Sequence, residues 1–90
     1  MRKITREICS AFEAGHKKTI SNSHTDGMSL WLHGNKIAEK RSDGIYISDG
    51  GYPLSMTTKE RLKYFASVYT KNYVDYVNGV EWDGNWIKVK

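Results

Sequence analysis

Cysteine and long apolar runs are scarce in this sequence, and their scarcity excludes several classes of protein. Cys9 is the only cysteine, so no intramolecular disulfide and no thiolate-rich zinc site can form. No stretch approaches the roughly 20 apolar residues of a membrane span, and no apolar run follows the basic start, as it would in a signal peptide. We therefore expect a soluble intracellular protein in which Cys9 is buried as a small apolar side chain.

The chain also lacks concentrated charge. It carries 14 Lys and Arg against 10 Asp and Glu, a formal net charge of +4, and its basic residues fall in small clusters that we expect to be solvated. Its 90 residues suffice for one domain, residues 1–90, with a modest core.

Residue patterns that support catalysis or metal binding are missing as well. His16, His24 and His33 do not follow a metal-ligand spacing. The run Asn-Ser-His-Thr-Asp at 22–26 contains the residue types of a hydrolase, but a working triad needs side chains that converge from the fold. The Asp-Gly-Gly sequence at 49–51 does not match a phosphate-binding loop and is expected to end a strand. We expect no enzyme, no metal and no cofactor.

The chain does contain the pattern of two short helices. Apolar residues at helical spacing, with Thr5 as N-cap and Gly15 as stop, predict a helix over about 5–14. The capping box Thr57-x-x-Glu60 predicts a second helix that starts at about 58 and ends near 65. Strands at about 67–71 and 73–77 then follow, because β-branched and aromatic residues favour strands. The alternative is one long helix over 58–78.

A meander of strands is predicted between the helices. Residues 28–33 alternate apolar and polar, Gly34-Asn35 suits a two-residue hairpin turn, and Ser42-Asp43-Gly44 suits a three-residue loop. This register places Trp31 opposite Ala38 and gathers five apolar side chains on one face: Leu30, Leu32, Ile37, Ile45 and Ile47. With a short strand at Thr19-Ile20 and strands around the turns at 78–79 and 83–85, the fold class is α+β. We expect an antiparallel sheet of about five to six strands with two short helices, and Trp82 and Trp86 in the core or in hairpin pairing.

Aromatic and basic residues alternate on the opposite face of this meander. The same register places there Trp31, His33, Lys36, Ala38, Lys40, Tyr46 and Ser48. Trp31 and Tyr46 could anchor a protein partner, and together with the lysines they could stack bases and neutralise phosphates. The structural alternative is that a helix covers this face, Trp31 packs on Ala38 and the lysines only extend to solvent. The candidate binding residues are Trp31, Lys36, Lys40 and Tyr46.

In three segments the chain resembles small proteins of tailed bacteriophages and prophages. The segments are TDGMSLWLHGNKIAEKRSDGIYISDGGY at 25–52, TTKERL at 57–62 and NGVEWDGNWIKV at 78–89. They resemble an LHGN-x-IA strand turn with a glycine segment, a TT-x-x-RLN helix start and an NG-x-x-WDG-x-W hairpin. The chain departs from that pattern at Lys63, where the pattern has asparagine, and over 64–77, which is shorter here. The resemblance implies a phage origin and the cytoplasm of an infected bacterium, and it implies no site residues.

These observations lead to two functional hypotheses of different classes. The first is a phage-encoded, non-enzymatic binding protein that acts on a host protein, in host takeover or as an inhibitor of antiviral defence. The alternative is a nucleic-acid-binding module that uses the basic and aromatic sheet face. We expect no membrane partner and no small-molecule cofactor. A steep loss of affinity with added salt indicates phosphate contacts, and a shallow one indicates an aromatic protein interface.

Overall fold

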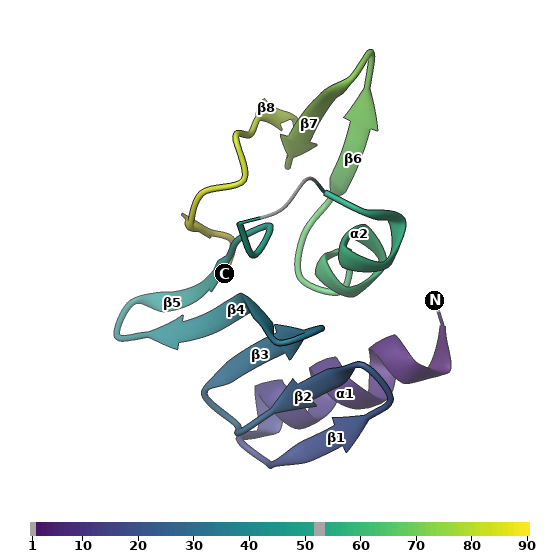
Figure 1. Cartoon of the computed structure of the whole chain (residues 1–90). Coiled ribbons are helices and arrows are strands. Elements are labelled where there is room, and N and C mark those ends of the chain that lie inside the picture. Colours follow the sequence, from purple (N-terminus) through teal and green to yellow (C-terminus); the bar gives the residue numbers. More distant parts are fainter. Residues whose placement is uncertain (1, 52–53) are drawn as a thin grey trace.

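Two helices lie on one side of a six-stranded antiparallel sheet, and a small three-stranded sheet stands beside it (Figure 1). The structure is a computed structural model that describes residues 2–51 and 54–90. The strand order is β1-β2-β3-β4-β5-β9 in the larger sheet and β6-β7-β8 in the smaller. The predicted α+β class, with an antiparallel sheet of about five to six strands and two short helices, is confirmed. The separate smaller sheet was not predicted.

The first helix, α1 (Lys3–Ala14), forms because Thr5, Ile8, Cys9 and Phe12 make one buried stripe at helical spacing. It ends at Gly15, whose φ of 78° is the left-handed conformation that glycine adopts without steric cost. The prediction that Thr5 is the N-cap of α1 is wrong. Arg2 occupies the N-cap position, and the Thr5 side chain is buried inside the first turn.

Six strands build the larger sheet. They are β1 (Lys18–Ile20), β2 (Ser23–Thr25), β3 (Ser29–Leu32), β4 (Asn35–Arg41), β5 (Gly44–Ile47) and β9 (Ile87–Lys88). Consecutive strands β1 to β5 pair as neighbours, which is the predicted meander, and β9 completes the sheet at the edge of β5.

The register between β3 and β4 differs from the prediction. The turn consists of His33-Gly34, with φ of 51° and 80°, instead of Gly34-Asn35. Trp31 therefore lies opposite Lys36, Leu30 lies opposite Ala38, and a β-bulge accommodates Ile37. The bulge allows the adjacent apolar residues Ile37 and Ala38 both to be buried, which strict alternation would forbid.

The loop between β4 and β5 is also shorter than predicted. Arg41 pairs with Gly44, so Ser42-Asp43 is a two-residue connection, and Ala38 lies opposite Ile47. Together with the bulge, this register turns Glu39 and Arg41 away from the core, and Lys40 towards the helices.

The second helix, α2 (Met56–Leu62), begins two residues before the predicted start. Ser55 is its N-cap, and the Ser55 hydroxyl accepts a hydrogen bond from the Thr58 main-chain N–H at 3.1 Å. The predicted capping box of Thr57 and Glu60 is therefore wrong. Turns, and not helix, occupy 63–65, and the alternative of one helix over 58–78 is wrong too.

The smaller sheet contains β6 (Val68–Lys71), β7 (Val74–Val77) and β8 (Val80–Glu81), and its first two strands confirm the predicted pair at about 67–71 and 73–77. The connecting turns Asn72-Tyr73 and Asn78-Gly79 have positive φ at both residues. The predicted C-terminal hairpin does not form, because β8 pairs with β7 whereas β9 crosses to β5.

The core lies between the helices and the larger sheet, and it contains one unexpected charge. Arg61 is the largest fully buried side chain, only 1% exposed. Its Nη1 donates to the Thr5 hydroxyl at 2.7 Å and its Nε to the Ser23 hydroxyl at 3.1 Å. Burial and the neighbouring Arg2 charge lower the pKa of Arg61. These bonds connect α2 to α1 and to β2.

Candidate functional site

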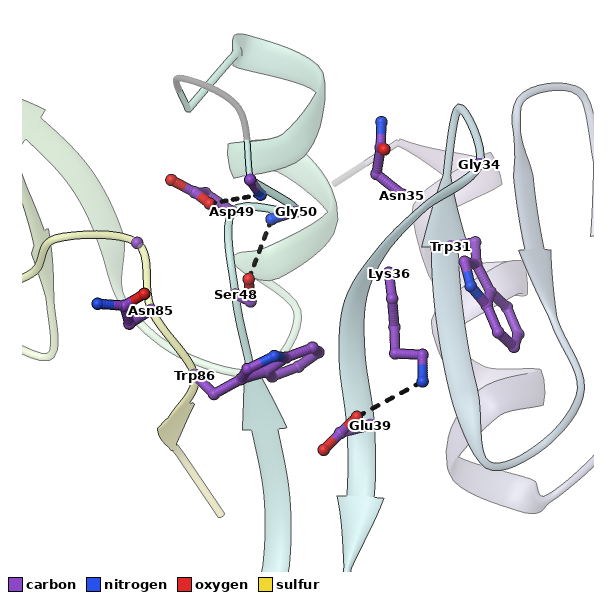
Figure 2. A pocket seen from close by; sticks show the side chains of 12 residues that line it. Trp31, Gly34, Asn35, Lys36, Glu39, Ser48, Asp49, Gly50, Asn85 and Trp86 are labelled. Carbon is purple, nitrogen blue, oxygen red and sulfur yellow. Dashed lines mark hydrogen bonds and ion pairs between the residues drawn. The ribbon is translucent and has the colours of Figure 1, made fainter.

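The side of the larger sheet that faces away from the helices carries most of the candidate binding residues. We call this surface the outer face; it consists of Trp31, Lys36, Glu39, Arg41, Tyr46 and Trp86. Strand alternation orients the side chains of β3, β4 and β5 in this set to the same side, because each lies on a non-core position of its strand. Trp86, which precedes β9, joins them through its contact with Arg41. Neither helix covers them: the helices pack against the core residues of the opposite side (Figure 2).

An arginine held between two aromatic rings is the centre of the outer face. The Arg41 guanidinium carbon lies 4.0 Å from the centroid of the Tyr46 ring and 5.5 Å from that of Trp86. Its Nε donates to Glu39 Oε2 at 2.6 Å, and this hydrogen bond raises the pKa of Arg41 above its ordinary value. The guanidinium is thus held by one charged hydrogen bond and two cation–π contacts.

The other charges of the outer face are paired as well. Lys36 Nζ lies 3.7 Å from Glu39 Oε1 and 5.6 Å from the centroid of the Trp31 ring. The Tyr46 hydroxyl donates to Asp43 Oδ2 at 2.8 Å, which raises the pKa of Tyr46 and lowers that of Asp43. Asp43 also lies 4.0 Å from Lys88 Nζ. Each cation here has a carboxylate neighbour.

A shallow hollow of about 590 Å³ opens on the outer face between Trp31 and Trp86. Figure 2 shows Lys36 and Glu39 between the two indoles, with Asn35 and Asn85 at the rim. The 49–51 turn forms one border, and its N–H groups are used internally, by Ser48 Oγ and Asp49 Oδ1. The turn therefore presents no free donors at Gly50 and Gly51 for a phosphate.

Trp86 reaches the outer face because of a glycine close to Asp49. Gly84 has a φ of 92°, and a Cβ at this position would collide with the Asp49 carboxylate. The Asp49 main-chain N–H donates to the Gly84 carbonyl at 3.0 Å, which fixes the 83–85 turn beside the end of β5. Trp82 is in the core, as predicted, whereas the prediction of core or hairpin pairing is wrong for Trp86.

The structure brings three of the four candidate residues together and separates the fourth. Trp31, Lys36 and Tyr46 share the outer face, but Lys40 lies on the opposite side. Lys40 Nζ donates to the carbonyls of Glu13 and Gly27, at 3.2 and 3.0 Å, and lies 5.2 Å from the centroid of the Phe12 ring. Lys40 therefore caps the C-terminal end of α1. The prediction that Lys40 lies beside Trp31 is wrong.

Of the other residues expected on this face, Ala38 lies elsewhere. Ala38 is fully buried on the core side, so Trp31 does not pack on it there. His33 is an exposed residue of the hairpin turn, as predicted, and Ser48 lines the hollow. Sequence reasoning missed Glu39, Arg41 and Trp86. The adjacent apolar pair Ile37-Ala38 was the available signal of a bulge that would bring Glu39 and Arg41 outwards.

The described residues offer neither a metal centre nor a membrane-spanning helix. Within 2–51 and 54–90, no group of three or more His, Cys, Asp or Glu side chains is placed to hold a metal ion. Neither α1 nor α2 has the length and apolar character that a membrane crossing demands.

Comparison with known proteins places the chain in one family. Neither curated proteins nor solved structures provide a match. The family model of the Kyanoviridae Gp96 protein matches residues 1–89, almost the whole chain. This match confirms the phage origin that the three sequence segments implied, and the chain belongs to the Kyanoviridae Gp96 family of phage proteins.

Proposed function

We propose that this phage protein is a non-enzymatic binding protein whose outer face attaches to a protein of the infected host. The observation that carries the proposal is the Arg41 guanidinium held between Tyr46 and Trp86, beside Trp31, on a sheet face that no helix covers. Tryptophan, tyrosine and arginine are the residues that most often dominate the energy of protein interfaces.

Pre-organisation supports a protein partner. Glu39 bonds to Arg41 and lies near Lys36, and Asp43 accepts from Tyr46, so these side chains are already held in one arrangement. Binding then requires less loss of side-chain freedom, which costs about 0.5–1.5 kcal/mol for each flexible side chain that is immobilised. A hydrogen-bonded sheet also supplies a rigid base for these anchors.

The charge balance of this face favours a protein over a nucleic acid. Glu39 neighbours both Lys36 and Arg41, and Asp43 neighbours Lys88, so the local positive charge is largely compensated. Phosphate contacts derive their affinity from cations that release counterions, and paired cations contribute little of this effect. The nucleic-acid hypothesis therefore has less support at the outer face.

The mode of action that follows is steric. A rigid sheet face that occupies a host protein surface blocks the normal ligand of that surface, which suits host takeover or inhibition of an antiviral defence. No catalytic step is needed.

The test begins with capture of partners from nuclease-treated bacterial lysate by the tagged protein. Each captured protein is then purified and titrated by calorimetry against wild type, Trp31→Ala and Tyr73→Ala. Tyr73 is the matched control, because its side chain is fully exposed in the turn between β6 and β7, away from the outer face.

We expect Trp31→Ala to weaken binding by about 2 kcal/mol or more, roughly thirtyfold, and Tyr73→Ala to leave it within about threefold. Equal effects of the two variants would remove the outer face as the binding surface. Capture that depends wholly on nucleic acid would remove the protein partner.

A further inference from the structure

The net positive charge of the molecule is concentrated in two segments that are distant in sequence. Residues 2–7 contain three cations and one carboxylate, and residues 59–63 contain the same numbers. Together these segments carry a net charge of +4, which equals the formal charge of the whole chain. The remaining residues therefore balance to zero.

The fold brings these segments together. The Arg2 main-chain N–H donates to Glu60 Oε1 at 3.0 Å, and the N-terminal end of α1 lies beside α2 (Figure 1). Arg2, Lys59 and Lys63 line a common hollow of about 270 Å³. We call this surface the basic patch; its cations are Arg2, Lys59 and Lys63.

The cations of the basic patch are largely uncompensated. None of the ion pairs of the described residues includes Arg2, Lys59 or Lys63. Glu60 is engaged by the Arg2 main-chain N–H, which lowers the pKa of Glu60. Beneath the patch, buried Arg61 is bonded to the hydroxyls of Thr5 and Ser23 and adds positive charge.

We propose that the basic patch binds the phosphate backbone of a nucleic acid without sequence preference. Uncompensated lysines and arginines around this hollow release phosphate counterions on binding, and this term supplies essentially all of non-specific affinity. An acidic protein is the less suitable ligand, because protein interfaces are anchored by buried aromatic and apolar side chains. Of the described residues that line the patch hollow, only Met56 has a large apolar side chain.

This inference is independent of the outer face and of the proposed host protein. It moves the nucleic-acid contact from the aromatic sheet surface to the side of the molecule that carries α1 and α2. One chain thereby presents two surfaces of different chemistry.

The test compares two double variants that change the total charge equally. Lys59→Glu with Lys63→Glu alters the basic patch, whereas Lys17→Glu with Lys18→Glu alters exposed residues at the start of β1. Both variants reduce the formal net charge from +4 to zero. Fluorescence anisotropy with a labelled DNA duplex of about 20 base pairs measures affinity from about 50 to 300 mM NaCl, and circular dichroism confirms folding.

We expect wild type to bind with a log–log salt slope of about −3, for three to four phosphate contacts. The Lys59/Lys63 variant should lose at least about thirtyfold in affinity and about two units of slope, and the Lys17/Lys18 variant should stay within about threefold. Equal losses in both variants would show that only total charge matters and would overturn the proposal. No duplex binding at about 50 mM NaCl, or equal binding of poly-glutamate, would overturn it as well.

Discussion

The outer face and the basic patch contain the same kinds of cations in opposite electrostatic surroundings. Lys36 and Arg41 on the outer face share the carboxylate of Glu39, and aromatic rings cover the Arg41 guanidinium. Arg2, Lys59 and Lys63 on the basic patch line an open hollow with no carboxylate pair among the described residues. The number of basic residues thus does not determine how strongly a surface attracts anions. The determining property is whether each cation is paired with a carboxylate.

The formal charge of +4 is therefore uninformative as a single number. A value this small is ordinary for a protein of 90 residues when it is spread over the surface. Here the two segments that carry this charge meet where α1 contacts α2. Three predictions test the contrast between the outer face and the basic patch, in order of decreasing effect.

The largest effect concerns Arg61, which supports the basic patch from below. Arg61→Ala removes the hydrogen bonds to Thr5 and Ser23 and leaves a cavity where α1, α2 and β2 meet. We expect a loss of about 3 kcal/mol in the free energy of unfolding, measured by urea denaturation and tryptophan fluorescence. Arg6→Ala, on the exposed side of α1, should change it by less than about 0.5 kcal/mol.

A second readout for this prediction is the thiol of Cys9. Burial raises the pKa of Cys9 to about 12, so the folded wild type should react very slowly with a thiol reagent near neutral pH. The Cys9 thiol donates to the Arg61 carbonyl, so it lies at the contact between α1 and α2. Arg61→Ala should accelerate the reaction, because loosening of this contact exposes the thiol to the reagent. A stability within about 1 kcal/mol of wild type and an unchanged labelling rate would contradict the structural role of Arg61.

A smaller effect is expected from removal of the charge that compensates the outer face. Glu39→Gln keeps the shape of the side chain but leaves Lys36 and Arg41 without their carboxylate. Duplex DNA should then bind about threefold to tenfold more tightly at low salt, with a salt slope steeper by about one. Glu81→Gln, which makes the same charge change on β8, should raise affinity less than twofold or so. Equal gains in both variants would mean that pairing on the outer face has no local consequence.

The smallest effect is confined to the Tyr46 hydroxyl. Ionised Asp43 accepts its hydrogen bond, so loss of the phenol proton is opposed and the pKa of Tyr46 is raised above its ordinary value. Asp43→Asn removes this negative charge, and the pKa of Tyr46 should therefore fall towards its ordinary value. An NMR titration of the tyrosine ring carbons measures the shift. A Tyr46 curve that stays in place would show that the Asp43–Tyr46 bond is not formed in solution.

Sequence reasoning predicted the two helices and the strand meander, but it misplaced both helix N-caps and both turns of the meander. Gly15 ended α1 and alternating residues produced the meander, because helix stops and strand alternation depend on near neighbours. It failed at Ile37, where one bulged residue changed which side chains of β4 face outwards and moved Lys40 away from Trp31.

The candidate site was predictable only in part for the same physical reason. Trp31, Lys36 and Tyr46 follow from alternation, but Trp86 reaches them through the Gly84 turn against Asp49, a contact between distant segments. Likewise, Lys59, Arg61 and Lys63 read as one solvated cluster. Only the packing of α2 against α1 buries Arg61 under the hydroxyls of Thr5 and Ser23 and joins the other two to Arg2.

The central claim is that two separate surfaces serve two classes of ligand, and an NMR titration tests it most directly. Addition of a DNA duplex of about 20 base pairs to the ¹⁵N-labelled protein should shift the amide signals of residues 2–7 and 56–63. The indole N–H signals of Trp31 and Trp86 should remain in place. If these two indole signals shift at the first additions of DNA while the amide signals of α1 and α2 do not, the nucleic acid binds the outer face. That result would contradict the account.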